Sequence, residues 1–181
     1  MNVIRRYIHI LLLFSLIICY NSLAASPTFN EYQVKAVFLY NFTQFVEWPT
    51  NAFDSEQSPI VIGILGKDPF GQQLDDLVKG EVVKNRKIEI KRYNDVKDVG
   101  GCHMLFISSS EKNHLDQILT PLKGKSILTI GDYDGFARQG GIIRLLPKND
   151  KITLMVNVDS AKEANITISS KILRNAEIIN K

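Results

Sequence analysis

The sequence predicts an α/β fold: a single domain with a central, mostly parallel sheet, flanking helices and a C-terminal antiparallel hairpin. Three observations predict it. Short apolar runs, typical of buried parallel strands, occur at residues 60–65, 104–107 and 127–130. Segments with helical spacing of apolar residues lie between these runs. Two strand-like segments, 142–146 and 151–158, then follow each other directly, as in a hairpin.

The first element is a helix expected from Glu31 to Val46. Many of its apolar residues fall at helical spacing on one face. Further apolar residues cover much of the opposite side, so the helix is apolar nearly all round. It is expected to end before Trp48-Pro49, because proline cannot continue a helix.

The middle of the chain alternates strands and helices. After the strand at 60–65, glycines at 66 and 71 mark a turn, and a short helix is expected at 72–79. Residues 87–93 alternate between apolar and polar, which indicates a strand nearer the sheet edge. After the strand at 104–107, Ser108 to Glu111 supply capping side chains for a helix through Leu122.

The last part of the chain is expected to hold the strand at 127–130, the hairpin and a final helix. A turn at Pro147 to Asp150 joins the two strands of the hairpin. The final helix is expected to begin near Asp159 and to break around Asn165. Its second part has four apolar residues on one face: Ile168, Ile172, Leu173 and Ala176.

Residues 1–24 have the features of a cleaved export signal. Arg5 and Arg6 are followed by a mostly apolar run at 8–18, and small residues at Ser22 and Ala24 suit a signal peptidase. The run is shorter than the roughly 20 residues that a membrane span needs. An uncleaved membrane anchor is the alternative. We therefore expect one domain at residues 25–181, working outside the cytoplasm.

Charge and cysteine content narrow the function further. Loss of residues 1–24 removes two arginines and no acid from a chain of formal net charge +3. No basic stripe or arginine-rich tail remains, so nucleic acid is not an expected partner. Beyond the signal only Cys102 is left, which excludes an internal disulfide. Because it opens an apolar run, a buried, inert thiol is expected, with an intermolecular bridge as the alternative.

Patterns of catalytic residues are missing. The two histidines beyond the signal, His103 and His114, have no metal-ligand spacing, and no cysteine cluster is present. The glycines at 63, 66 and 71 do not match a dinucleotide fingerprint. We expect neither an enzyme nor a bound cofactor or metal.

A small-ligand site is one functional hypothesis. Ligands of open α/β sheets settle at the carboxyl ends of parallel strands, where helix N-termini favour anions. Here these ends present five polar candidates: Lys67, Asp68, Ser108, Ser109 and Asp132. Ordinary loop chemistry explains the same residues as an alternative.

The other hypothesis is a protein-binding surface. The region from residue 29 to residue 53 is crowded with aromatic side chains. A small domain cannot easily enclose a helix that is apolar all round, so part of this surface is expected to meet a partner. The candidates for partner binding are Tyr40, Phe45 and Trp48.

Five blocks of the sequence, in order, resemble the YfiR family and cover nearly all of the chain after the signal. They are 35–49 (KAVFLYNFTQFVEWP), 62–71 (IGILG followed by DPFG), 102–108 (CHMLFIS), 128–143 (LTIGD, GFA and GGII) and 168–173 (ISSKIL).

The resemblance implies a periplasmic α/β protein that represses a membrane diguanylate cyclase through its periplasmic region, which lowers cyclic di-GMP and biofilm formation. It also implies a sequestering outer-membrane lipoprotein as a second partner, and a homodimer as the assembly. A periplasmic small-ligand sensor is the alternative function. The best-known members carry paired cysteines linked to redox sensing, and this chain, which has only Cys102 beyond the signal, differs from them.

Overall fold

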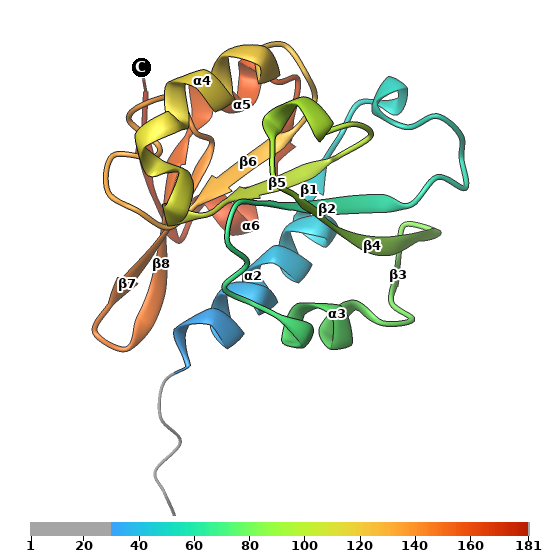
Figure 1. Cartoon of the computed structure of the whole chain (residues 1–181), viewed down its shortest axis with the longest axis horizontal. Helices are drawn as coiled ribbons and strands as arrows, with labels where there is room; N and C mark the ends of the chain where they lie inside the picture. Colours follow the sequence, from blue (N-terminus) through green and yellow to red (C-terminus); the bar gives the residue numbers. More distant parts are fainter. Residues whose placement is uncertain (1–29, 181) are drawn as a thin grey trace, which may run out of the picture.

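The computed structural model describes residues 30–180, which form an eight-stranded mixed sheet with helices on both faces (Figure 1). The predicted signal at 1–24 lies outside the described residues. The strands are β1 (Val46–Glu47), β2 (Ile60–Leu65), β3 (Val82–Val83), β4 (Arg86–Tyr93), β5 (Met104–Ile107), β6 (Leu128–Gly131), β7 (Ile143–Lys148), β8 (Lys151–Asn157), β9 (Thr167–Ile168) and β10 (Ala176–Ile179). The α-helices are α2 (Glu31–Phe45), α3 (Gln72–Val78), α4 (Leu115–Leu119), α5 (Val158–Glu163) and α6 (Ser170–Leu173). Short 3₁₀ segments are η1 (Thr50–Ala52), η2 (Val96–Asp98), η3 (Ser109–His114) and η4 (Thr120–Leu122).

The sheet has the order β10-β8-β7-β6-β5-β2-β4-β3. Its centre, from β4 through β2, β5 and β6 to β7, is parallel, whereas β7–β8 and β3–β4 are antiparallel hairpins. Every residue of β2, β5 and β6 is buried, as their unbroken apolar sequences predict. The predicted α/β fold, with its mostly parallel sheet and its hairpin, is confirmed.

Helix α2 covers one face of the sheet together with α3, and α4 covers the opposite face (Figure 1). Asn30 caps α2, since its side chain accepts a hydrogen bond from the backbone N–H of Gln33. Ala36, Leu39 and Phe42 on its inner face are at most 2 % exposed. The predicted helix is confirmed, and β1 follows it directly, before Pro49.

The segment after β5 is less regular than predicted. Instead of one helix through Leu122, it forms three short elements in succession: the 3₁₀ segment η3, the five-residue α-helix α4 and the 3₁₀ segment η4. The expected cap is present, because the Ser108 hydroxyl accepts from the backbone N–H of Ser110. Pro121 has no N–H to donate, and the chain around it closes into the 3₁₀ segment η4.

The prediction of a final helix reaching Ala176 was wrong. Asn165 adopts a left-handed conformation, with φ of 54°, and stops α5. Ile168 lies in β9, where it pairs with Val46 of β1, and only Ser170–Leu173 return to helix. Residues Ala176–Ile179 form β10, which pairs in parallel with β8 and makes the sheet edge. The hairpin therefore lies one strand in from this edge.

No helix between residues 30 and 180 combines the length and apolar character needed to cross a membrane.

Candidate functional site

Tyr40 and Trp48, two of the predicted partner-binding residues, lie on one surface beside the β3–β4 edge of the sheet. Two cavities, of about 410 and 210 Å³, share Lys84 as a lining residue: the first also contains Tyr40, and the second Trp48. We call this region the aromatic surface. Its members are Tyr40, Trp48, Phe53, Val82, Lys84 and Arg86.

The β3–β4 hairpin positions the exposed part of the aromatic surface. Lys84 and Asn85 form its two-residue turn with φ of 51° and 63°, as a type I′ turn requires. The Lys84 ammonium donates to the carbonyl of Val46 (3.1 Å), which ties the hairpin to the end of α2. Val82 presents an apolar side chain that is 57 % exposed.

Hydrogen bonds fix the orientation of the two half-buried aromatic side chains. The Tyr40 hydroxyl donates to Glu81 Oε2 (2.7 Å), and this bond raises the pKa of Tyr40. The Trp48 indole N–H donates to the carbonyl of His103 (2.9 Å). Each of the two aromatic rings is thus held in one orientation by a hydrogen bond.

His103 forms the floor beneath the aromatic surface. Its ring stacks on Phe53 at 4.2 Å between centroids and meets Trp48 edge-on at 6.3 Å. Nδ1 accepts from the backbone N–H of Val61 (3.1 Å), so Nε2 carries the proton and donates to the carbonyl of Ala52 (3.0 Å). Burial lowers the pKa of His103, which keeps the ring neutral.

Arg86 covers the outer side of Phe53. Its guanidinium lies 3.8 Å from the ring centroid and donates to the carbonyls of Ser55 and Ser58, at 2.8 and 2.7 Å. The aromatic surface therefore combines exposed apolar area with a cation of fixed position, a combination typical of protein-binding sites.

Phe45, the third predicted partner-binding residue, lies on a different side of α2 from Tyr40. The two residues are five positions apart, which corresponds to a rotation of about 140° around the helix axis. The Lys171 ammonium, from α6, sits 5.2 Å from its ring centroid. The structure thus joins Tyr40 and Trp48 in one surface but not Phe45, whose part in partner binding stays a prediction.

At the carboxyl end of the sheet, Asp132 forms an ion pair with Lys35 of α2. Lys35 Nζ lies 2.6 Å from Asp132 Oδ2, and both side chains are at least 96 % buried. Lys35 also contacts Glu31 and lies 4.4 Å from the ring centroid of Tyr32. Burial, with the nearby Asp132 carboxylate, raises the pKa of Tyr32 to about 12. Asp132 is therefore already neutralised by a neighbour that links α2 to β6.

Of the remaining strand-end candidates, Asp68 and Ser108 also have side chains engaged within the protein. Asp68 pairs with Arg92 (2.8 Å), which binds Asp75 as well. The backbone N–H of Lys67 donates to the hydroxyl of Ser110.

Ser108 is buried as the cap of η3, whereas Ser109 is exposed. These side-chain contacts favour a structural role for Asp68, Ser108 and Asp132. Ligand binding at Lys67, Asp68, Ser108, Ser109 and Asp132 stays a prediction.

Several residues of these sites were missed in the sequence. The spacing of Glu31 and Lys35, four apart on an apolar helix, was a readable signal of an ion pair. Phe53 belongs to the aromatic crowding at 29–53 but was not among the candidates. Val82 and Arg86 carry no such local signal, because only the fold brings them to the aromatic surface. Residues 30–180 contain no group of three or more His, Cys, Asp or Glu side chains that could hold a metal ion.

Comparison with known proteins places this arrangement in a family. Residues 32–177 match the family model described as YfiR/HmsC-like, which spans nearly all of α2, the whole aromatic surface and nearly all of the sheet. No curated protein sequence matches the chain.

Proposed function

Because the chain belongs to the YfiR/HmsC-like family, we propose that it works in the periplasm and represses a membrane-bound diguanylate cyclase. Binding to the periplasmic region of the cyclase would lower cyclic di-GMP and biofilm formation. The family match carries this proposal, since this family is regulatory rather than catalytic. The chain then acts by binding, with no reaction of its own and no cofactor.

The cyclase would bind at the aromatic surface. Tyr and Trp are among the side chains that contribute most to protein interfaces, because they bury large areas at little entropic cost. Here both are held by hydrogen bonds, and Val82 adds an apolar side chain that is 57 % exposed. Arg86, fixed over Phe53, would pair with a carboxylate of the partner.

Repression follows from a population shift. A protein that binds the inactive arrangement of the cyclase more tightly than the active one moves the equilibrium toward the inactive state. A differential affinity of about 3 kcal/mol changes the ratio of the two states more than a hundredfold. A lipoprotein that binds the same surface would release the cyclase, and a homodimer would present the surface twice.

The first experiment measures cyclic di-GMP in a strain that lacks the gene, with and without a complementing copy. We expect the concentration to rise on deletion and to fall again with the wild-type copy. An unchanged concentration, while the wild-type strain makes the protein, would contradict the repressor function.

A pair of matched variants then tests the surface. Val82→Glu places a charge on the exposed apolar part of the aromatic surface, next to Tyr40, whereas Ile178→Glu places one on β10 at the opposite edge of the sheet, at a side chain 45 % exposed. We expect Val82→Glu to raise cyclic di-GMP to the level of the deletion strain and Ile178→Glu to repress normally. Normal repression by Val82→Glu, with deletion still raising cyclic di-GMP, would exclude the surface and leave the repressor function standing.

A further inference from the structure

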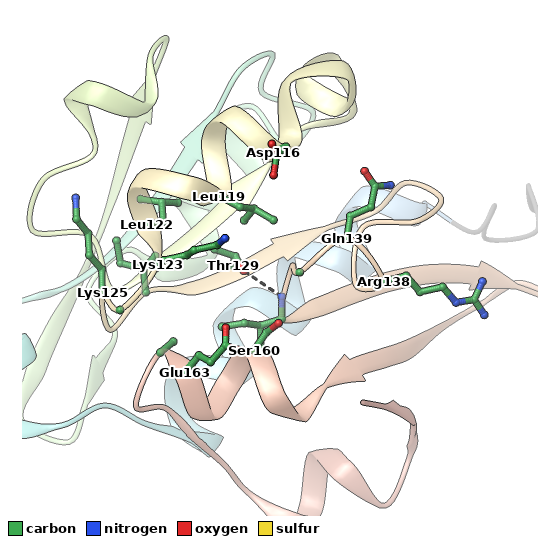
Figure 2. Close-up of a pocket in the computed structure, with 15 residues that line it drawn as sticks. Asp116, Leu119, Leu122, Lys123, Lys125, Thr129, Arg138, Gln139, Ser160 and Glu163 are labelled. Carbon is green, nitrogen blue, oxygen red and sulfur yellow. Dashed lines mark hydrogen bonds between the residues drawn. The ribbon is translucent and has the colours of Figure 1, made fainter. Parts of the chain in front are cut away.

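A separate cavity of about 400 Å³ lies on the α4 side of the sheet (Figure 2). It opens above β6 and the entry to β7, with η4 and the loop after it on one side and α5 on the other. None of its lining residues belongs to the aromatic surface or to the strand-end candidates. Its volume is in the range of small-molecule sites, about 300–1,000 Å³.

The cavity has an apolar wall and two buried hydroxyl groups. Leu119, Leu122 and Ile127 form the wall, and each is at most 8 % exposed. Thr129, 5 % exposed, accepts the backbone N–H of Ile142 (3.0 Å), so its own O–H is left to donate.

Ser160 is the second hydroxyl, and it is 6 % exposed. Its Oγ has no hydrogen-bond partner among residues 30–180. A buried hydroxyl without a partner is unfavourable, and a rotation of the Ser160 side chain toward the cavity would let an acceptor of a ligand remove that cost.

One cation, the ammonium of Lys123, lies over the two hydroxyl groups of the cavity. Figure 2 shows the ammonium of Lys123 directed toward Thr129, whereas Lys125 and Arg138 extend away from the centre of the cavity. Lys123 has no ion-pair partner among the described residues. Asp116 and Glu163 also border the cavity, and their charges oppose a ligand that carries more than one negative charge.

We propose that this cavity binds a small monocarboxylate with a short unbranched apolar chain. The carboxylate accepts hydrogen bonds from the Lys123 ammonium and from the hydroxyls of Thr129 and Ser160. The chain lies along Leu119, Leu122 and Ile127. Charge selects an anion, the two acidic side chains favour a single negative charge, and the apolar wall selects a hydrocarbon tail.

Calorimetric titration of the purified protein with acetate, butyrate and hexanoate tests this proposal. Hexan-1-ol and hexylamine are the controls for charge. We expect affinity to increase from acetate to hexanoate and to be lost when the carboxylate is replaced by the alcohol or the amine. No saturable binding of hexanoate at millimolar concentration, or equal binding of hexanoate and hexylamine, would overturn the proposal.

Two variants locate the carboxylate. Lys123→Gln should weaken hexanoate binding about tenfold or more, as expected for the loss of a charged hydrogen bond. Lys125→Gln removes a neighbouring charge that points away from the cavity, and it should bind like the wild type. Equal affinity of Lys123→Gln and wild type would overturn the assignment.

Ser160→Ala separates binding from stability. Because the hydroxyl has no partner in the described protein, its removal should leave the Tm of the free protein unchanged or raise it, while hexanoate binds several-fold more weakly. Unaltered hexanoate binding would contradict the role of Ser160. These measurements need no cyclase, so their failure leaves the proposed regulatory function untouched, and the reverse is also true.

Discussion

Lys35 is a charged side chain in the protein interior. It is 1 % exposed, and its ammonium contacts Asp132 at 2.6 Å and also Glu31. Charges in such a place are costly unless they are paired, because the interior solvates them poorly. The pair joins the second turn of α2 to the carboxyl end of β6, so two elements distant in the sequence are linked by one contact.

Replacing one partner of this pair should therefore be strongly destabilising. Lys35→Met leaves the Asp132 carboxylate buried without its cation, and we expect a loss of about 3–5 kcal/mol of unfolding free energy in urea. The double variant Lys35→Met/Asp132→Leu, which removes both charges, should recover most of the loss. A single variant as stable as wild type would show that the pair contributes nothing to the fold.

His103 couples stability to pH. Its folded-state pKa lies below the ordinary value near 6.5, because burial disfavours the charged ring and Nδ1 is occupied as an acceptor. Below about pH 6.5 the unfolded chain binds a proton that the folded chain refuses. The contribution of His103 to the unfolding free energy should thus be fully present above pH 6.5. It should fall as the pH drops toward the folded pKa, by at most about 1.4 kcal/mol per pH unit.

Urea unfolding between about pH 5 and pH 7 measures this slope. His103→Gln should be less stable overall but should lose this part of the pH dependence. His114→Gln is the control, since that side chain is 60 % exposed and away from the core. An identical slope in His103→Gln and wild type would assign the pH dependence to other groups.

The loop from residue 132 to residue 142, between β6 and β7, is built around one buried aromatic ring. Phe136 is fully buried, packs edge-on against Tyr133 at 5.3 Å between centroids, and accepts the backbone N–H of Gly141. Gly131 and Gly141 lie so close to this ring that a Cβ on either would overlap it. The glycine-rich character of this segment is therefore a packing requirement.

Gly141→Ala should consequently destabilise the protein through this overlap. Its backbone does not adopt a positive φ, so the cost is steric, and we expect roughly 1–3 kcal/mol in thermal or urea unfolding. Gly100→Ala is the matched control, because nothing lies within 4 Å of its added Cβ. The second substitution Phe136→Leu should relieve part of the cost. Equal stability of the Gly141→Ala and Gly100→Ala variants would contradict this packing.

Elements with a strong local pattern could be predicted, and elements defined by distant pairing could not. The apolar runs of β2, β5 and β6 and the helical spacing of α2 were sufficient. The strands β9 and β10 have two and four residues, and each exists because it pairs with a strand that is not its neighbour in the sequence, β1 and β8 respectively. Apolar spacing at 168–176 imitates a helix when those partners are unknown.

The same limit applies to the candidate site. Aromatic crowding pointed to Tyr40 and Trp48, which the fold places in one surface, but Phe45 follows the helix to another side. Val82 and Arg86 enter the surface only through the β3–β4 hairpin. Asp132 looked like a ligand-binding residue, because nothing near it in the sequence reveals that Lys35 neutralises it.

As a whole, the molecule depends on two layers of apolar packing, one on each face of the sheet. Cys102 lies in the α4-side layer at the entry to β5, 6 % exposed, with its thiol 2.9 Å from the carbonyl of Met104. Burial raises the pKa of Cys102 to about 12. This arrangement agrees with the inert thiol expected from the sequence, because burial disfavours the reactive thiolate and keeps reagents away from the sulfur.

Reactivity of Cys102 should therefore report the opening of the whole fold. In the protein without residues 1–24, whose one cysteine is Cys102, an aromatic disulfide reagent should label the native state at least about a thousandfold more slowly than the protein in urea. Reaching this thiol requires the α4-side layer to separate from the central strands, so the labelling rate should follow the global unfolding free energy of each variant. A reductant should leave the Tm unchanged. Rapid labelling of the native protein, or a Tm that falls with reductant, would instead indicate an accessible thiol that forms a bridge between two chains.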